Sequence, residues 1–325
     1  MTSLTIGSLV SPGGFSNKME AVMFKLNAVV CATDLSEGSN KAVPIAAQMA
    51  GHHGAKLIIA HIIDLPAVTP YGETMVDPQE LRSWVEQSAK AQITDILAHC
   101  EQVEWELNIA IGYPAKEILQ IVEDVSADMV VAATHTRSGI ERLLLGSVSR
   151  KLMHTLNVPL LIVPGDMSPE QLGRPLEDVL IACDFSPDSG NAVRWGIDFA
   201  QAFGAKMTMA TVIENSQLSQ LLKLDPQKEH GMAEKLQADL NVKLQETVPE
   251  EYRDTIKPET VVLAGQPHEE LNKYAILNHI DLIVMGVHGR GLIENLLVGS
   301  TTDRLVRLGQ FPVMAVRAGV PEQQA

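Results

Sequence analysis

Residues 180–186 read Leu-Ile-Ala-Cys-Asp-Phe-Ser and repeat residues 29–36, Val-Val-Cys-Ala-Thr-Asp-Leu-Ser, with Asp184 standing 150 positions after Asp34. Three further pairs are each separated by 153 positions: Gly112 and Gly265, Asp128 and Asp281, and Gly146 and Gly299. A nearly constant offset along most of the chain indicates two copies of one structural unit. The change from 150 to 153 predicts a small insertion between the second and third strands of the second copy.

Length and composition agree with two globular units. The chain has 325 residues, of which 46% are hydrophobic and 20% charged, and a domain usually contains about 100–200 residues. With 25 basic and 40 acidic groups the net charge is −15, which argues against nucleic acid as a partner. No apolar stretch approaches the roughly 20 residues that span a membrane. Three cysteines without a CxxC pair favour a cytoplasmic protein.

Strand and helix patterns alternate within each copy. In the first copy, apolar strand patterns cover 28–32, 56–63, 104–111, 129–134 and 160–163, and helical patterns lie near 38–51, 80–99, 114 onward and 147–156. This alternation predicts an α/β fold: two tandem doubly wound, Rossmann-like domains. Each would have a mostly parallel five-stranded sheet in the order 3-2-1-4-5 and about four helices. The expected boundaries are a flexible extension at 1–22, domains at 23–165 and 178–318, a linker at 166–177 and a tail at 319–325.

A glycine-rich loop follows the fourth strand of the second copy. It reads Gly286-Val287-His288-Gly289-Arg290-Gly291, and nine residues separate Gly289 from Gly299-Ser300-Thr301-Thr302, which opens a helix. Glycines let backbone N–H groups approach an anion, and a helix N-terminus offers further unpaired N–H groups. Ligands of doubly wound sheets lie beyond the carboxyl ends of the strands, where Asp184 also stands. The pattern therefore predicts a phosphate site.

The spacing Gly-x2-Gly-x9-Gly-Ser, between a strand and a helix, resembles the ATP-binding signature of the universal stress protein family. The resemblance covers nearly the whole chain from Met23, as two tandem family domains. It implies ATP as the ligand, accompanied by Mg2+. It also implies pairing between the last strands, 160–163 and 313–316, which would make the chain an intramolecular pseudo-dimer. A further homodimer would remain open.

The resemblance also implies residue roles in the second copy. Gly286, Gly289, Gly299 and Ser300 match the signature and would hold the triphosphate. Asp184 would lie near the nucleoside and its metal, and the backbone of Val212 would contact adenine. The remaining candidates for binding the nucleotide are His288, Arg290, Thr301 and Thr302. Two simpler interpretations stay open: Asp184 as a helix N-cap, and His288 as a structural residue.

The first copy departs from the signature. Ala133 and Thr136 replace the first two glycines, and a β-branched threonine resists positive φ and crowds an approaching phosphate. Four weaker candidates remain in this copy: Asp34, Ile62, Gly146 and Ser147. We therefore expect ATP in the second copy and a structural or different role for the first.

Two other functions compete with a nucleotide-binding regulatory protein. The chain could be an interaction protein that needs no nucleotide, using the pseudo-dimer surface or the insertion. It could also be an adenylating enzyme, but such enzymes carry a Ser-Gly-Gly-x-Asp-Ser loop, and neither 34–38 nor 184–188 fits it. Because no activated nucleophile is evident near the loop, we assign no catalytic residue and expect at most slow ATP hydrolysis.

Overall fold

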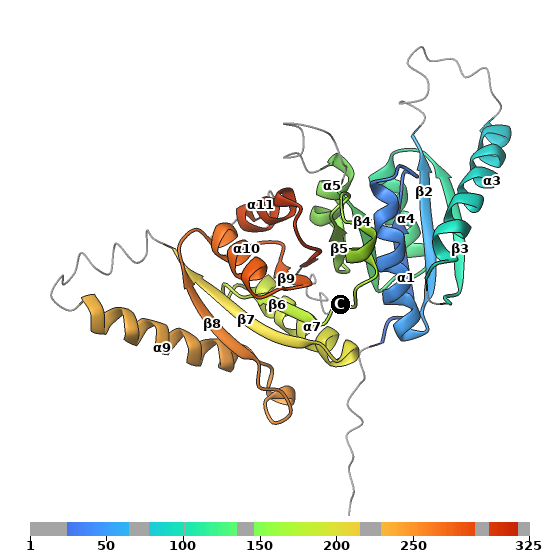
Figure 1. Cartoon of the computed structure of the whole chain (residues 1–325). Helices are drawn as coiled ribbons and strands as arrows, with labels where there is room; N and C mark the ends of the chain where they lie inside the picture. Colours follow the sequence, from blue (N-terminus) through green and yellow to red (C-terminus); the bar gives the residue numbers. More distant parts are fainter. Residues whose placement is uncertain are drawn as a thin grey trace, which may run out of the picture.

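One ten-stranded sheet runs through the protein, in the order β3-β2-β1-β4-β5-β10-β9-β6-β7-β8 (Figure 1). The computed structural model describes residues 25–64, 78–100, 102–134, 146–214, 229–289 and 299–317. The strands of the first half are β1 (Ala28–Ala32), β2 (Lys56–Ile63), β3 (Trp105–Ile111), β4 (Met129–Ala133) and β5 (Leu160–Val163). Those of the second are β6 (Asp178–Ala182), β7 (Lys206–Ile213), β8 (Glu259–Ala264), β9 (Leu282–Gly286) and β10 (Val313–Val316). Each half is parallel with strand order 3-2-1-4-5, which confirms the predicted fold.

Helices cover both faces of the sheet. One face is covered by α1 (Ala42–His53), α3 (Pro78–Leu97), α7 (Pro187–Phe203) and α9 (Glu229–Thr247). The other is covered by α4 (Pro114–Asp124), α5 (Ser147–Thr155), α10 (Pro267–Leu277) and α11 (Ser300–Leu308). Successive strand residues face opposite sides, so Val29 and Val30 join different core clusters, and each cluster extends through both halves. Across the described ranges, no helix combines the length and apolarity needed to cross a membrane.

The helix after the first strand begins differently in the two halves. In the second half, α7 starts at Pro187, directly after the turn that follows β6. The aligned position in the first half is residue 37 (187 − 150), yet a short 3-10 turn at Ser39–Lys41 comes first and α1 starts only at Ala42. The first turn of α7 therefore lies where the first half has no α-helix.

The predicted linker contains a short helix, α6 (Pro169–Leu172). Ser168 caps it: its hydroxyl accepts from the Gln171 N–H, and the Gln171 side chain accepts from the Ser168 N–H. This reciprocal capping box explains why a segment expected to be a plain connection forms a helical turn. The predicted extension, 1–22, and tail, 319–325, lie outside the described residues.

The two halves meet along β5 and β10, which pair antiparallel with Met314 opposite Leu161. At one end of this seam the His52 ring stacks on Phe203 with ring centroids 4.1 Å apart, and its Nε2 lies 2.6 Å from the Ala202 carbonyl oxygen. Arg317, just after β10, donates from Nη1 to the carbonyl of His154 in α5 at 2.8 Å. The seam is thus formed by backbone pairing and by side-chain contacts from both halves.

The halves use complementary side-chain sizes at one helix–sheet contact. A Cβ placed on Gly196 of α7 would lie 2.5 Å from Cδ1 of Ile181 in β6. The positions 150 residues earlier hold Ala46 and Cys31. The first half therefore has a larger helix residue and a smaller strand residue than the second half at this contact. All three of Ile181, Ala46 and Cys31 are fully buried. Because buried side chains cannot move far, a larger residue at position 196 would crowd Ile181.

We predict that Gly196→Ala lowers the free energy of unfolding by about 1–3 kcal/mol through overpacking. The matched control is Gly190→Ala on the same helix, where an added Cβ meets nothing within 4 Å and a gain of about 0.4–1 kcal/mol is expected. Urea denaturation at equilibrium measures both. The double variant Gly196→Ala/Ile181→Cys should recover part of the loss; equal losses for Gly196→Ala and the double variant would contradict this packing argument.

The seam also predicts a dependence of stability on pH. Burial first, and then nearby basic side chains, lower the pKa of His154; these side chains include Lys151, Arg317 and Arg150. Because the folded protein disfavours the protonated ring, this contribution to stability is present above the pKa of an unfolded histidine, about 6.5, and is lost as pH falls through the lower, folded value. Burial lowers the pKa of His53 and His268 in the same direction.

We therefore expect the melting temperature to fall between about pH 7.5 and pH 5.5, and to fall less in His154→Gln. Thermal denaturation monitored by circular dichroism across this range measures the slope. A slope in His154→Gln as steep as in the wild type would contradict the assignment.

Candidate functional site

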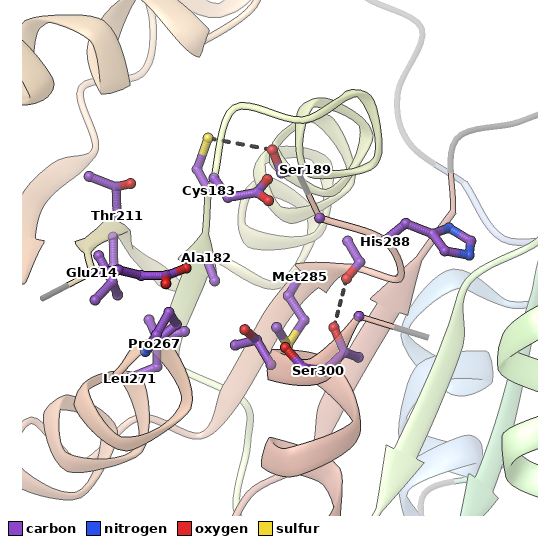
Figure 2. A pocket seen from close by; sticks show the side chains of 18 residues that line it. Ala182, Cys183, Ser189, Thr211, Glu214, Pro267, Leu271, Met285, His288 and Ser300 are labelled. Atoms are coloured by element: carbon purple, nitrogen blue, oxygen red, sulfur yellow. Dashed lines mark hydrogen bonds between the residues drawn. The ribbon is translucent and has the colours of Figure 1, made fainter. Parts of the chain in front are cut away.

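A cavity of about 450 Å3 lies at the carboxyl ends of β6, β7 and β9, between α7, α10 and α11 (Figure 2). It is lined by Ala182, Cys183, Asp184, Ser189, Ala210, Thr211, Val212, Glu214, Pro267, Leu271, Met285, Gly286, His288, Gly289, Gly299, Ser300, Thr301 and Thr302. The volume falls within the roughly 300–1,000 Å3 typical of small-molecule sites. Every predicted residue of the second half is in this lining except Arg290, which lies outside the described residues.

One end of the cavity is apolar. Ala182 ends β6 and pairs in register with Ala210 within β7, and their small side chains leave space above the sheet. Met285 and Leu271, both largely buried, line the same region from β9 and α10. Val212 follows on β7. This surface suits a flat, apolar ring whose edges can reach strand backbone.

The other end is the N-terminus of α11. Gly299 precedes the helix, and its N–H donates to the Val287 carbonyl at 2.7 Å. A Cβ on Gly299 would lie 3.0 Å from that carbonyl oxygen, which explains the need for glycine. Ser300 and Thr301 then begin the helix and line the cavity. First-turn N–H groups have no partner within their own helix and carry partial positive charge, so this end suits an anion.

Gly286 and Gly289 permit two close approaches to the loop after β6. A Cβ on Gly286 would lie 2.8 Å from Cβ of Asp188 and 2.9 Å from the Ser189 nitrogen. A Cβ on Gly289 would lie 2.8 Å from Oδ2 of Asp184. At Gly286 a side chain would collide with the backbone of the first turn of α7, which cannot easily move. At Gly289 it would meet the end of the Asp184 side chain, which would have to shift.

Asp184 supports the turn that precedes α7 and also lines the cavity. Its Oδ1 accepts from the Ser186 N–H at 3.0 Å and from the Ser186 hydroxyl at 2.6 Å. Ser186 is in turn the N-cap of α7, accepting from the Ser189 N–H. Phe185 between them has φ 63°, a left-handed conformation that is rare for a bulky side chain. The aligned Leu35 has φ 65°, so both halves make the same sharp turn.

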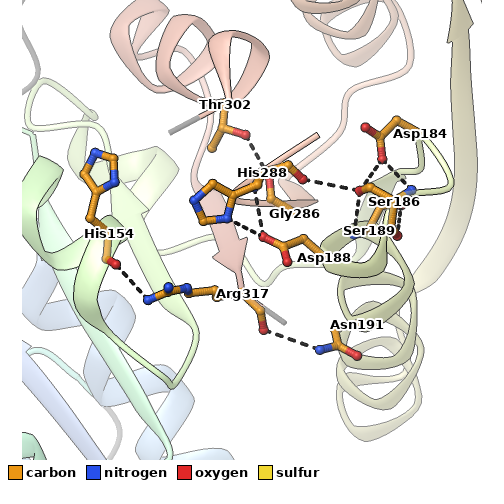
Figure 3. A network of polar contacts seen from close by, with 10 residues as sticks. All are labelled: His154, Asp184, Ser186, Asp188, Ser189, Asn191, Gly286, His288, Thr302 and Arg317. Atoms are coloured by element: carbon orange, nitrogen blue, oxygen red, sulfur yellow. Dashed lines mark hydrogen bonds and ion pairs between the residues drawn. The ribbon is translucent and has the colours of Figure 1, made fainter. Parts of the chain in front are cut away.

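The side chain of His288 points away from the cavity toward the seam (Figure 2). Its backbone N–H and its ring Nδ1 both lie within hydrogen-bond distance of Oδ2 of Asp188, at 2.9 and 2.8 Å (Figure 3). His288 therefore lines the cavity with backbone atoms, and its ring has a structural partner on α7.

The hydroxyl of Thr302 is directed at the loop. It donates to the Gly286 carbonyl at 2.8 Å, and the residue is only 2% exposed. This bond joins the first turn of α11 to the end of β9, so the Thr302 hydroxyl has a structural role. Its N–H is one of the first-turn N–H groups described above.

The first half has a related but different turn. Asp34 accepts from the Ser36 N–H at 2.9 Å and from the Ser39 hydroxyl at 2.5 Å. Gly38 occupies the position of Asp188, and Ala133 that of Gly286. Ile62 is buried on β2, and Gly146 precedes α5, which Ser147 begins. Thr136 and the rest of 135–145 lie outside the described residues.

Two carboxylates, Asp184 and Glu214, line the cavity. In the described part of the chain, no group of three or more His, Cys, Asp or Glu side chains is arranged to hold a metal ion. A cation at this site would therefore need most of its oxygen ligands from the bound molecule and from water.

Several lining residues carried no recognisable sequence signal. Thr211, Glu214, Leu271 and Met285 enter the cavity because the topology brings β7, β9 and α10 together, and no local pattern marks them. Asp188 had a partial signal: it is an acidic residue in the first turn of a helix, one position after Pro187. Such a residue usually serves the helix dipole, so its bond to the glycine loop was not foreseeable.

Known proteins resemble this chain, some over nearly its whole length and others over one half. A universal stress protein of Mycolicibacterium smegmatis is 29% identical over 297 residues, covering 89% of this chain and 96% of that protein. A solved universal stress protein from Archaeoglobus fulgidus has the same fold, with a TM-score of 0.68 at 22% identity, over 91% of this chain and 100% of its own. A solved universal stress protein in complex with cAMP covers 43% of this chain and 98% of its own, at 26% identity and a TM-score of 0.33.

The sequence model of the universal stress protein family matches twice, at residues 25–164 and 175–317. The first match contains β1 to β5 and the second contains β6 to β10, so each corresponds to one half of the ten-stranded sheet. These matches confirm the resemblance inferred from the glycine signature and the repeat. The chain belongs to the universal stress protein family, with two family domains in tandem.

Proposed function

We propose that the second half binds ATP and that the protein is a nucleotide-dependent regulator. The observation that carries this proposal is a single cavity with an apolar, small-residue floor at one end and the α11 N-terminus at the other. Adenine fits the first end, next to the backbone of Val212, and the phosphates fit the second. Gly289 and Gly299 of the family signature lie at the second end, beside the start of α11.

The phosphates would be bound mainly by backbone N–H groups of the loop and of α11, with hydroxyl groups of Ser300 and Thr301 beside them. This arrangement lets an acidic chain bind an anion without a large basic patch. Arg290, in the loop just beyond Gly289, is the candidate for a direct positive charge.

Mg2+ fits the donor set of this site. Asp184 and Glu214 would repel an uncompensated triphosphate, and Mg2+ is commonly held by one or two carboxylates together with phosphate oxygens and water. Asp184 is the residue to contact the ion, directly or through water. The ion would supply neutralisation of charge between the carboxylate and the phosphates.

We propose a structural role for the first half, as the partner in an intramolecular pseudo-dimer. The antiparallel pairing of β5 with β10 and the continuous core on both faces support this role. Catalysis is not part of the proposal: His288 is bonded to Asp188 rather than to a serine or cysteine, so the described lining offers no base-activated nucleophile.

The test compares thermal stability with and without MgATP. Ligand at about 100 times its Kd stabilises a folded protein by about 2.7 kcal/mol, so the wild type should melt at a clearly higher temperature. Gly289→Val should abolish the shift, because its Cβ would displace the Asp184 carboxylate, whose Oδ2 lies 2.8 Å away, and its methyl groups would add bulk to the loop that the phosphates approach.

The matched control is Gly231→Val on α9, where an added Cβ meets nothing within 4 Å. This variant should retain the full ATP-dependent shift. If ATP stabilises Gly289→Val as much as the wild type, the site is wrongly assigned, and if ATP fails to stabilise the wild type, the proposed function is wrong.

A further inference from the structure

One oxygen of Asp188 holds one loop residue in two places. Oδ2 accepts from the His288 N–H at 2.9 Å and from the ring Nδ1 at 2.8 Å (Figure 3). The side chains of Asp188 and His288 are only 10% and 18% exposed. Hydrogen bonds to a carboxylate that is shielded from water are among the stronger ones in proteins. The contact therefore fixes both the backbone and the ring of His288.

The carboxylate also determines which ring nitrogen carries hydrogen. An ionised carboxylate can only accept, so Nδ1 of His288 must be the donor. A neutral ring in this position is then the Nδ1–H tautomer. This assignment gives the contact a signature that can be observed without any nucleotide.

The geometry extends from His288 to Gly289. The carbonyl oxygen of His288 lies 3.3 Å from the Ser186 hydroxyl, on the side of the β6–α7 turn. In a trans peptide the N–H points opposite to the preceding carbonyl. The Gly289 N–H therefore points away from the β6–α7 turn. The Gly289 nitrogen is also 3.6 Å from where a Cβ of Gly299 would stand, beside the N-terminus of α11.

The first half lacks this contact. Gly38 replaces Asp188, and α1 begins five positions later in the repeat than α7 does. Ala133 replaces Gly286, which in the second half must be glycine because the backbone and Cβ of Asp188 come within 3 Å. Asp188, which bonds to the loop, and Gly286, which lets α7 come close to β9, thus occur together in the second half. Both are replaced in the first half.

We propose that Asp188 is a positioning residue for nucleotide binding: by holding His288, it orients the Gly289 N–H toward the phosphate end of the cavity. The proposal rests on the proposed function, since it assigns the loop conformation that the nucleotide needs. It goes beyond that function by naming a residue outside the glycine signature, acting through another residue.

The experiment measures MgATP affinity by isothermal titration calorimetry for Asp188→Asn, His288→Gln and the double variant. Each single change should weaken binding about 10-fold or more, as expected for a lost hydrogen bond to a charged group. Because both residues act through one contact, the double variant should bind no more weakly than the weaker single variant, within about twofold. His288→Gln leaves the start of α7 intact, so it still tests the contact if Asp188→Asn folds poorly.

The control is Asp198→Asn, the same change on the same helix. Asp198 accepts a hydrogen bond from the Tyr252 hydroxyl and is absent from the cavity lining. This variant should keep its MgATP affinity within about twofold of the wild type, whatever it does to stability.

A second readout uses the protein without nucleotide. The ring 15N shifts of His288 should show hydrogen on Nδ1 in the wild type and a move toward the common Nε2–H tautomer in Asp188→Asn. Suppose that the wild type binds MgATP. If Asp188→Asn then binds it with the same affinity, or shows the same His288 15N shifts as the wild type, the positioning role alone is overturned. A wild type that binds no MgATP overturns the proposed function, and the role in binding with it, even where the 15N shifts show that the contact exists.

Discussion

The close approach of the first turn of α7 to the end of β9 is the constraint that shapes the cavity of the second half. Gly286 permits it, because any side chain there would collide with Asp188 and Ser189. With α7 that close, Asp188 accepts from the His288 N–H, while Thr302 and Gly299 donate to the Gly286 and Val287 carbonyls from the start of α11. These short contacts bring the glycine loop and the α11 N-terminus together on one side of the sheet.

The two halves share a fold but differ in how closely the helix after the first strand approaches the fourth strand. Both share strand order, the left-handed turn at Leu35 and Phe185, and buried strands packed on both faces. They differ in side-chain size at two places. Ala46 and Cys31 stand where the second half has Gly196 and Ile181. Gly38 and Ala133 stand where the second half has Asp188 and Gly286. The first exchange is one of side-chain size within the core. The second leaves the first half without the carboxylate and the glycine that bring α7 and the loop after β9 together in the second half.

The fold could be predicted from the sequence because each half carries the same local signals. Continuous apolar runs mark β1 and β6, prolines mark the starts of α4 and α10, and the offset of 150–153 residues fixes the two halves. Sequence reasoning also named most of the phosphate end, where the glycines are local in sequence. It could not place Thr211, Glu214 or Leu271, which meet only through topology, nor the ring of His288, whose orientation depends on an acid 100 residues away. The simpler interpretation of Asp184 as a helix N-cap is wrong, because Ser186 caps α7 while Asp184 accepts from the Ser186 N–H and lines the cavity.

The central claim is that this chain has one nucleotide site, in its second half. The most direct measurement is the number of nucleotides bound per chain in saturating MgATP, by native mass spectrometry of the full-length protein. The account predicts one ATP per chain. Two per chain would show that the first half binds despite lacking Asp188 and Gly286, and none would show that the cavity is not an ATP site.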